Sequence, residues 1–86
     1  MEIDVTNLTK FYSLLLLYQG PKHGYELIKE IEEHTHKKPS TSQIYPFLMK
    51  LKENGLIKID ETGDRDKKVY VLTEKGVIFV KKKFEM

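Results

Sequence analysis

Hydrophobic residues recur at helical spacing in three successive segments before residue 56. We expect the first helix over about residues 7–19, with Asn7 or Thr6 as its cap and an end at Gly20. Its apolar arc is wider than one core face needs, because residues 14–17 are all leucine. This helix should therefore contact neighbours on more than one side, and part of its surface can meet another subunit.

A second amphipathic helix is expected over about residues 24–34, followed by a polar loop. A third is expected over residues 41–54, because Ser40 and Gln43 have the spacing of a capping box and Gly55 is a stop signal. The hydrophobic set of this third helix is Ile44, Phe47, Leu48 and Leu51. These residues are predicted to face the core.

From residue 56 onwards the pattern changes from helical to extended. Two segments between residues 56 and 73, rich in Ile, Val, Tyr and Leu, flank a tip at residues 63–66 and predict a β-hairpin. Thr73 then begins a last helix over residues 74–86 that carries a lysine run. The order predicts an α+β fold, mostly α: a winged helix-turn-helix with three helices, a β-hairpin wing and a C-terminal helix, as a single domain over residues 1–86.

Composition supports one globular domain, since the 86 residues are 33% charged and 40% hydrophobic. A domain of this size buries only a modest core, which favours a partner subunit. The chain has no cysteine, which excludes disulfides, thiolate zinc sites and cysteine nucleophiles. The apolar run at residues 14–17 is far shorter than the roughly 20 residues of a membrane span, and no basic leader precedes it. We therefore expect a soluble, cytoplasmic protein that does not insert into a membrane.

Charge is distributed unevenly along the chain. Residues 2–33 carry six acids and three bases, a balance of −3, whereas residues 34–86 carry seven acids and twelve bases, a balance of +5. The net charge of +2 is a weak indication of nucleic-acid binding by itself. Its distribution indicates which half should face a polyanion.

The outward face of the third helix is the main candidate for function. About 100° per residue places Ser42, Tyr45, Pro46 and Met49 opposite the hydrophobic set, with Lys50 beside them. Hydroxyl, phenol and thioether groups can enter a major groove about 12 Å wide, where glutamates would be repelled. An ordinary surface helix with two apolar residues is the alternative interpretation.

Pro46 is a second indication. We interpret it as lying near the helix N-terminus, where a missing N–H costs little. Free N–H groups at the positive end of the helix dipole there would suit a phosphate oxygen. The alternative is a tolerated proline near a helix start.

Three stretches cover most of residues 8–80: His23-Gly24-Tyr25-Glu26; Ile44-Tyr45-Pro46-Phe47-Leu48 through Leu51 to Gly55-Leu56-Ile57; and Tyr70-Val71-Leu72-Thr73-Glu74-Lys75-Gly76. Taken together, in this order and spacing, they resemble the PadR family of winged-helix transcription regulators. The resemblance implies a dimeric repressor whose third helix enters the major groove while the wing touches the flanking backbone or minor groove. Larger members continue into a C-terminal helical domain, whereas this sequence stops after one helix, so we expect a short form.

The sequence leads to two sets of candidate residues. The DNA-binding set is Ser40, Thr41, Ser42, Gln43, Tyr45, Pro46, Met49 and Lys50 on the third helix, with Arg65, Lys67 and Lys68 on the wing. The homodimer set, on the first and last helices, is Leu8, Phe11, Tyr12, Leu15, Val77, Val80, Lys81 and Phe84. Double-stranded DNA and a second copy of the chain are thus the expected partners. A small-molecule effector is left open, because no residue here matches a particular ligand site.

Enzymatic and metal-binding interpretations find little support. His34 and His36 have the spacing of a loop metal site but lack a third ligand, and the hairpin carboxylates, including Asp60 and Glu61, have basic neighbours typical of a solvated turn. No glycine-rich phosphate loop or nucleophile motif is present, so we expect no enzyme, cofactor or metal. The alternative function is a winged-helix protein–protein interaction module without specific DNA binding, because fold alone does not determine function.

Overall fold

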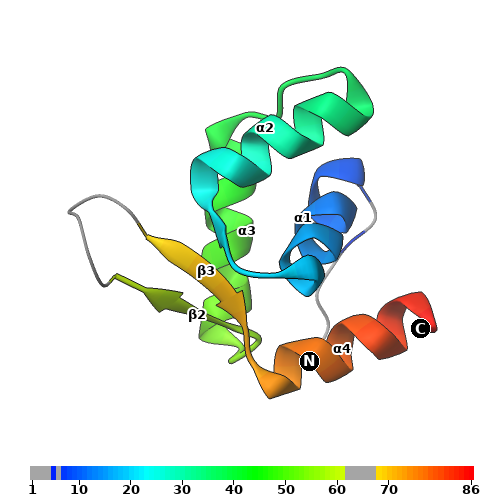
Figure 1. Ribbon diagram of the computed structural model, residues 1–86, viewed down its shortest axis with the longest axis vertical. Helices are drawn as coiled ribbons and strands as arrows, with labels where there is room; N and C mark the ends of the chain where they lie inside the picture. The colour runs from blue at the N-terminus through cyan, green and yellow to red at the C-terminus, as the bar shows by residue number, and fades with distance from the viewer. Residues whose placement is uncertain (1–4, 6, 62–67) are drawn as a thin grey trace.

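The computed structural model describes residue 5 and residues 7–61 and 68–86. In chain order the elements are α1 (Leu8–Gln19), β1 (Lys22–His23), α2 (Gly24–Thr35), α3 (Thr41–Glu53), β2 (Ile57–Asp60), β3 (Val69–Leu72) and α4 (Glu74–Phe84). Figure 1 shows α1, α2 and α3 packed together, the β2–β3 hairpin on one side of them, and α4 below α1. The predicted α+β, mostly helical, winged-helix fold is therefore confirmed.

Side-chain caps define several of the helix ends. Asn7 Oδ1 accepts a hydrogen bond from the Lys10 backbone N–H at 2.9 Å, and Thr73 Oγ1 accepts one from Gly76 at 3.0 Å, as the sequence predicted for both starts. The predicted capping box at Ser40 and Gln43 is wrong. Ser40 Oγ lies 2.9 Å from the Ser42 hydroxyl, and the Gln43 N–H donates to the Ser40 carbonyl oxygen at 3.1 Å instead.

The core lies where the three helices meet the sheet. From α3 it takes Ile44, Phe47, Leu48 and Leu51, and all four are buried as predicted. Three of the four consecutive leucines of α1 are also buried, and α1 contacts α2, α3, α4 and β3. The expectation that α1 packs on more than one side is thus confirmed.

The sheet has three antiparallel strands in the order β1-β3-β2. The β2–β3 pair, with Ile57 opposite Leu72, is the predicted hairpin. The two-residue strand β1 was not predicted, because two residues are too few to show a strand periodicity. It pairs Lys22 with Tyr70 and His23 with Val69, and so places the beginning of α2 beside the wing.

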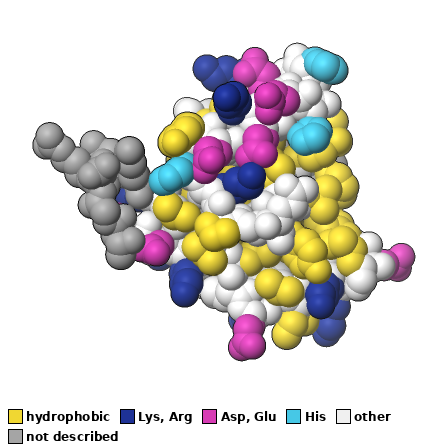
Figure 2. Space-filling view, viewed as in Figure 1, with side chains coloured by type: hydrophobic (Ala, Val, Ile, Leu, Met, Phe, Trp, Pro, Cys, Tyr) yellow, Lys and Arg dark blue, Asp and Glu magenta, His cyan; other side chains and the backbone are white. Residues whose placement is uncertain are grey.

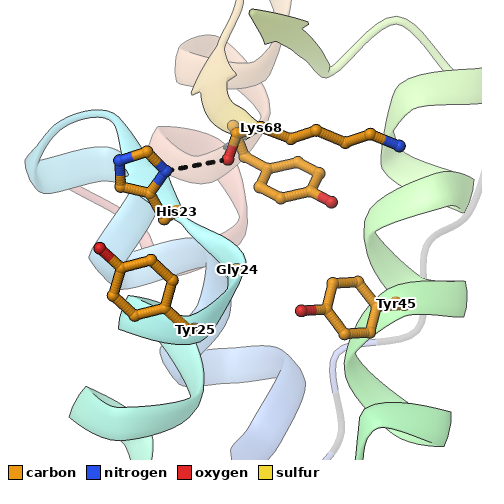
Figure 3. A pocket seen from close by; sticks show the side chains of 6 residues that line it. His23, Gly24, Tyr25, Tyr45 and Lys68 are labelled. Carbon is orange, nitrogen blue, oxygen red and sulfur yellow. Dashed lines mark hydrogen bonds between the residues drawn. The ribbon is translucent and has the colours of Figure 1, made fainter. Parts of the chain in front are cut away.

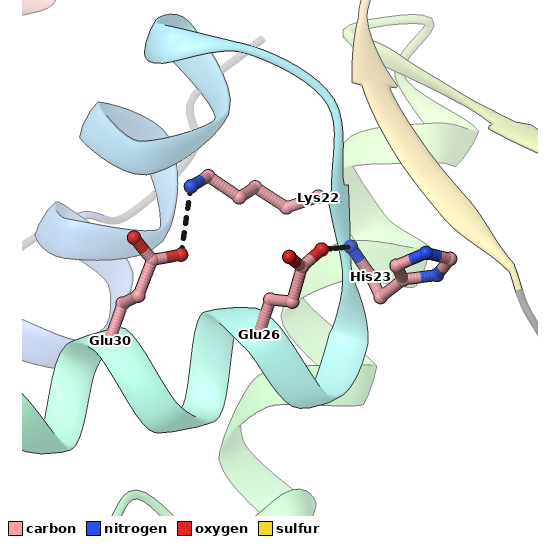
Figure 4. Close-up of polar contacts among 4 residues, drawn as sticks. All are labelled: Lys22, His23, Glu26 and Glu30. Carbon is pink, nitrogen blue, oxygen red and sulfur yellow. Dashed lines mark hydrogen bonds and ion pairs between the residues drawn. The ribbon is translucent and has the colours of Figure 1, made fainter.

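Two polar contacts connect β1 to the helix that follows it (Figure 4). Lys22 Nζ lies 2.8 Å from Glu30 Oε2, and the His23 backbone N–H donates to Glu26 Oε1 at 2.8 Å. The second contact satisfies one of the N–H groups that a helix start leaves without an intrahelical partner. Together they hold His23 at the junction of β1, β3 and α2.

Helix α4 packs closely against the turn between α3 and β2. A Cβ atom at Gly76 would overlap the carbonyl oxygen of Leu56, so this position requires glycine. The Thr73 N–H donates to the same Leu56 oxygen at 3.0 Å, and the Thr73 hydroxyl donates to the Gly55 oxygen at 2.7 Å. Within the described residues, no helix is long and apolar enough to cross a membrane.

Val80 on α4 requires a correction. The sequence analysis placed it on an uncovered dimer face, but its side chain is completely buried in the core of its own protomer. Helical spacing identified it as apolar, yet could not show that α4 turns this side chain inward. The prediction that Val80 is left for a partner subunit is wrong.

Candidate nucleic-acid interface

The exposed face of α3 has the phase that the sequence predicted. Tyr45 is 41% exposed and Met49 is 47% exposed, and Ser42, Pro46 and Lys50 are exposed as well. These side chains lie on the side of α3 opposite the buried hydrophobic set. The predicted phase of α3 is therefore confirmed, and its function as a DNA-binding face stays a prediction.

The N-terminal end of α3 is polar and free of acids. Ser40, Thr41, Ser42 and Gln43 are all exposed, and no acidic residue occupies the first turn. Pro46 lies inside the helix that begins at Thr41, one turn beyond the capping region. The interpretation of Pro46 as an N-terminal proline is wrong, since its missing N–H would have bonded to the carbonyl of Ser42.

A hollow of about 230 Å³ lies on one side of α3, and we name it the tyrosine pocket. It is lined by His23, Gly24, Tyr25, Tyr45, Lys68 and Tyr70. Figure 3 shows the Tyr45 side chain pointing from α3 toward the beginning of α2. A Cβ atom at Gly24 would come within 2.7 Å of the Tyr45 hydroxyl oxygen, so glycine at this position makes room for the tyrosine.

The groups around the tyrosine pocket are cationic or able to donate hydrogen bonds. The Lys68 side chain extends toward α3 (Figure 3), and its carbonyl oxygen lies 3.2 Å from His23 Nδ1. The His23 ring stacks on Tyr25 with centroids 5.3 Å apart. Burial, followed by the nearby Tyr45 and Glu61, raises the pKa of Tyr70, so its hydroxyl keeps its proton at neutral pH. Phenol and ammonium groups of this kind suit an anionic oxygen.

A second depression, which we name the lysine groove, lies between α3 and the start of α1. It is lined by Asn7, Lys10, Ser42, Gln43, Pro46, Phe47 and Lys50. Lys10 Nζ lies 5.7 Å from the centroid of the Phe47 ring, which supports the ammonium group over an aromatic face. At about 100° per residue, Tyr45 and the pair Gln43 and Lys50 lie on different edges of the exposed face of α3. The helix therefore runs between the tyrosine pocket and the lysine groove.

The structure gathers most of the candidate DNA-binding residues around α3. Of the wing residues, Lys68 lines the tyrosine pocket, whereas Arg65 and Lys67 lie outside the described residues. The sequence analysis did not select the remaining lining residues: His23, Gly24, Tyr25, Tyr70, Asn7, Lys10 and Phe47. The stretch from His23 to Glu26 was a usable signal, but it was used only for the family resemblance.

Apolar side chains also remain exposed on α1 and α4. Leu8 is 61% exposed, and Phe11 and Phe84 are half-buried and meet edge to face with ring centroids 5.0 Å apart. The Tyr12 ring stacks on His34, which lies near the end of α2. In the view of Figure 2, hydrophobic side chains are gathered on the side of the molecule where α1 and α4 lie. Such a continuous patch is typical of an interaction surface.

Comparison with known proteins agrees with this arrangement. The Transcriptional regulator PadR-like family matches residues 14–82. Over 63 residues the chain is 46% identical to the transcriptional regulator YqjI of Escherichia coli (strain K12), covering 71% of this chain and 30% of that protein. The chain thus spans less than a third of the length of this relative.

Solved structures give the same result. RosR of H. salinarum has a TM-score of 0.82 at 28% identity, covering 95% of this chain and 73% of that one. A PadR-like transcription factor from Bacteroides fragilis has a TM-score of 0.77 at 23% identity, over 87% of this chain and 75% of that one, and shows the shared fold. The fold is that of a winged-helix protein, and the family match identifies the class as transcriptional regulators. The chain belongs to the PadR-like family of transcriptional regulators, which are not enzymes.

Proposed function

We propose that this chain binds double-stranded DNA sequence-specifically and acts as a repressor in the form of a homodimer. In this proposal α3 enters the major groove, and the wing meets the flanking backbone or minor groove. The observation that carries the proposal is the exposed, acid-free N-terminal face of α3 between the tyrosine pocket and the lysine groove. This face presents groups that can reach base edges, with cationic groups on both sides of it.

The two flanking sites match the geometry of a major groove. A helix in the groove has a phosphate backbone on each side, and phosphate contacts supply register and much of the affinity. In the proposed complex, Lys68 and the tyrosine hydroxyls hold one backbone. Lys10 and Lys50 hold the other. If α3 had cationic groups along one edge only, we would expect it to contact the phosphate backbone of one DNA strand rather than of both.

Two acids of α2 are already engaged. Glu30 is paired with Lys22, and Glu26 accepts the His23 N–H, both at 2.8 Å. The Lys22 ammonium group offsets the charge of Glu30, so α2 can approach a phosphate backbone with less repulsion than its four glutamates suggest.

A salt series on duplex DNA tests the proposal. Fluorescence anisotropy on a random-sequence duplex and on duplexes selected from a random library would give affinity against salt concentration. We expect a steep loss with salt, and Lys50→Ala should lower the slope of log K against log salt by about one for each lost phosphate contact. Lys83→Ala, which removes the same charge from exposed α4, is the matched control and should leave the slope unchanged. Salt-independent binding, or none, would favour the protein–protein module instead.

The proposed dimer joins the α1 and α4 patches of two copies, through Leu8, Phe11, Tyr12, Leu15, Val77, Lys81 and Phe84. Two α3 helices on one face of DNA need a spacing near one helical turn, about 34 Å, so the selected site should be an inverted repeat with half-sites about 10 base pairs apart or a multiple of that.

Light scattering tests the dimer. Leu8→Glu should shift the mass of the particle from dimer toward monomer. Tyr25→Glu introduces the same charge at a side chain that is 63% exposed, close to the 61% of Leu8, and should leave the mass unchanged. Equal masses for both variants would exclude the α1 and α4 patch as the interface. Run-off transcription from a promoter carrying the selected site should fall when the protein is added, and a rise would identify an activator.

A further inference from the structure

The centre of the exposed face of α3 is apolar. We propose that Met49 and Pro46 contact the 5-methyl groups of thymine, so that α3 reads A·T base pairs in each half-site. This inference rests on the DNA binding proposed above and adds the class of base pair that the helix selects.

The placement of the side chains is the first support. At about 100° per residue, Ser42, Pro46 and Met49 fall within roughly 60° of one another, directly opposite the buried set of α3. Met49 is 47% exposed although its thioether is apolar, and Pro46 beside it is exposed too. About half of Met49 is thus exposed to solvent, on the part of α3 that would lie deepest in a major groove.

The chemistry of the major groove supplies the second support. The thymine methyl is the apolar group that base edges present there, and guanine is read most often by arginine or lysine on N7 and O6. Helix α3 has no arginine, and at about 100° per residue Lys50 and Lys52 lie on opposite edges of the exposed face rather than at its apolar centre. The one acid of α3, Glu53, is its last residue, so cytosine amino groups have no acceptor of this kind at the N-terminal end.

The polar groups at the start of α3 complement the same base pair. Gln43 is exposed, and a glutamine side chain can pair with adenine through N6 and N7. Ser42 can bond to either partner. An amide for adenine near Pro46 for a thymine methyl fits A·T, and Met49 would meet a methyl group further along the groove.

An apolar strip of this kind could also bind a protein. The tyrosine pocket and the lysine groove argue for DNA, because they place cationic groups along both edges of the strip. This complements two rows of phosphates, whereas a protein partner would need acidic residues on both sides of its contact surface.

Uracil lacks the 5-methyl group and pairs like thymine, so it isolates the proposed contact. Duplexes are selected from a random library, and the enriched site is then prepared twice, once with thymine and once with uracil throughout. We expect the uracil form to bind about fourfold more weakly for each methyl group that loses its contact, the effect of one CH₂-sized group left unburied. A dimer with one such contact in each half-site should lose about 15-fold.

Variants assign the contact to residues. Met49→Ala should bring the ratio of thymine to uracil affinity toward one, because its contact is lost in both duplexes. Met86→Ala is the matched control: Met86 is 55% exposed, lies two residues beyond the end of α4 and should preserve the full ratio. Thermal melts of both variants should match the wild type, since each side chain is about half exposed.

The outcomes separate this inference from the function on which it rests. Equal affinity for thymine and uracil duplexes, or enrichment of G·C pairs alone, would overturn the methyl contact while leaving salt-dependent DNA binding in place. A thymine preference that Met49→Ala does not change would overturn the assignment to Met49. If no duplex is retained in the selection, DNA binding itself is wrong, and the methyl contact is wrong with it.

Discussion

Gly76→Ala should destabilise the protein markedly, although alanine normally stabilises a helix. The added Cβ would overlap the Leu56 carbonyl oxygen and come within 2.9 Å of a methyl carbon of Leu72. The nearest obstacle is backbone, so no side-chain rotation can relieve it. Helix α4 has to move away from β2, and this stretches the 3.0 Å hydrogen bond from Thr73 to Leu56 and loosens the packing of Val80.

The magnitude follows from three opposing contributions. Overpacking a close contact costs about 1–3 kcal/mol, and loss of the hydrogen bond costs about 1 kcal/mol. The higher helix propensity of alanine returns about 1 kcal/mol. The free energy of unfolding should therefore fall by about 2 kcal/mol. For a domain of this size, that lowers Tm by roughly 8–16 °C.

Thermal and urea unfolding monitored by circular dichroism measure this effect, with Gly24→Ala as the matched comparison. Its Cβ would come within 2.7 Å of the Tyr45 hydroxyl oxygen, but that side chain is 41% exposed and can swing aside. Gly24→Ala should keep nearly the wild-type Tm and lose DNA affinity, because it displaces a residue of the tyrosine pocket. A Gly76→Ala protein that melts at or above the wild-type temperature would show that α4 is not held against Leu56.

Three further predictions concern individual side chains. Tyr45→Ala should lower specific DNA affinity, measured by anisotropy, while Tm changes little; a large loss of Tm would mean that the ring is part of the core. Lys22→Ala should lower the free energy of unfolding by less than about 1 kcal/mol, because its pair with Glu30 is partly exposed to solvent; a larger loss in urea unfolding would mean that the pair holds β1 in place. The raised pKa of Tyr70 means that the unfolded chain ionises first, so stability should fall as pH rises above about 10, and Tyr70→Phe should reduce that fall in a pH series of urea melts; an identical profile for both proteins would assign the loss to other groups.

Periodicity was sufficient for the long elements of this fold. A hydrophobic residue every three or four positions fixes which face of α3 is buried, so the exposure of Ser42, Pro46 and Met49 followed directly from the pattern. Local caps such as Asn7 and Thr73 were also readable, because their hydrogen bonds join residues three apart. Ser40 failed as a capping-box residue since a second hydroxyl, Ser42, competes for it at 2.9 Å.

The features that the sequence did not reveal all depend on contacts between distant segments. Strand β1 is two residues long and exists through its pairing with β3, 46 positions further along at His23 and Val69. The tyrosine pocket joins α2, α3 and the wing, and no local pattern connects Gly24 with Tyr45. Val80 shows the same limit, because apolar spacing cannot tell an inward side chain on α4 from one that faces a partner.

These long-range contacts also explain how α3 and the wing keep a fixed orientation relative to one another. Strand β1 pairs with β3 of the wing and continues directly into α2, so the wing and the start of α2 move together. Tyr45 then extends from α3 to Gly24, which is buried at that helix start. A shift of the wing relative to α3 must therefore change the tyrosine pocket, and a group bound in that pocket must resist the shift. In the proposed complex, a phosphate held by Lys68 and Tyr45 would stabilise the one orientation in which α3 and the wing follow the same DNA duplex.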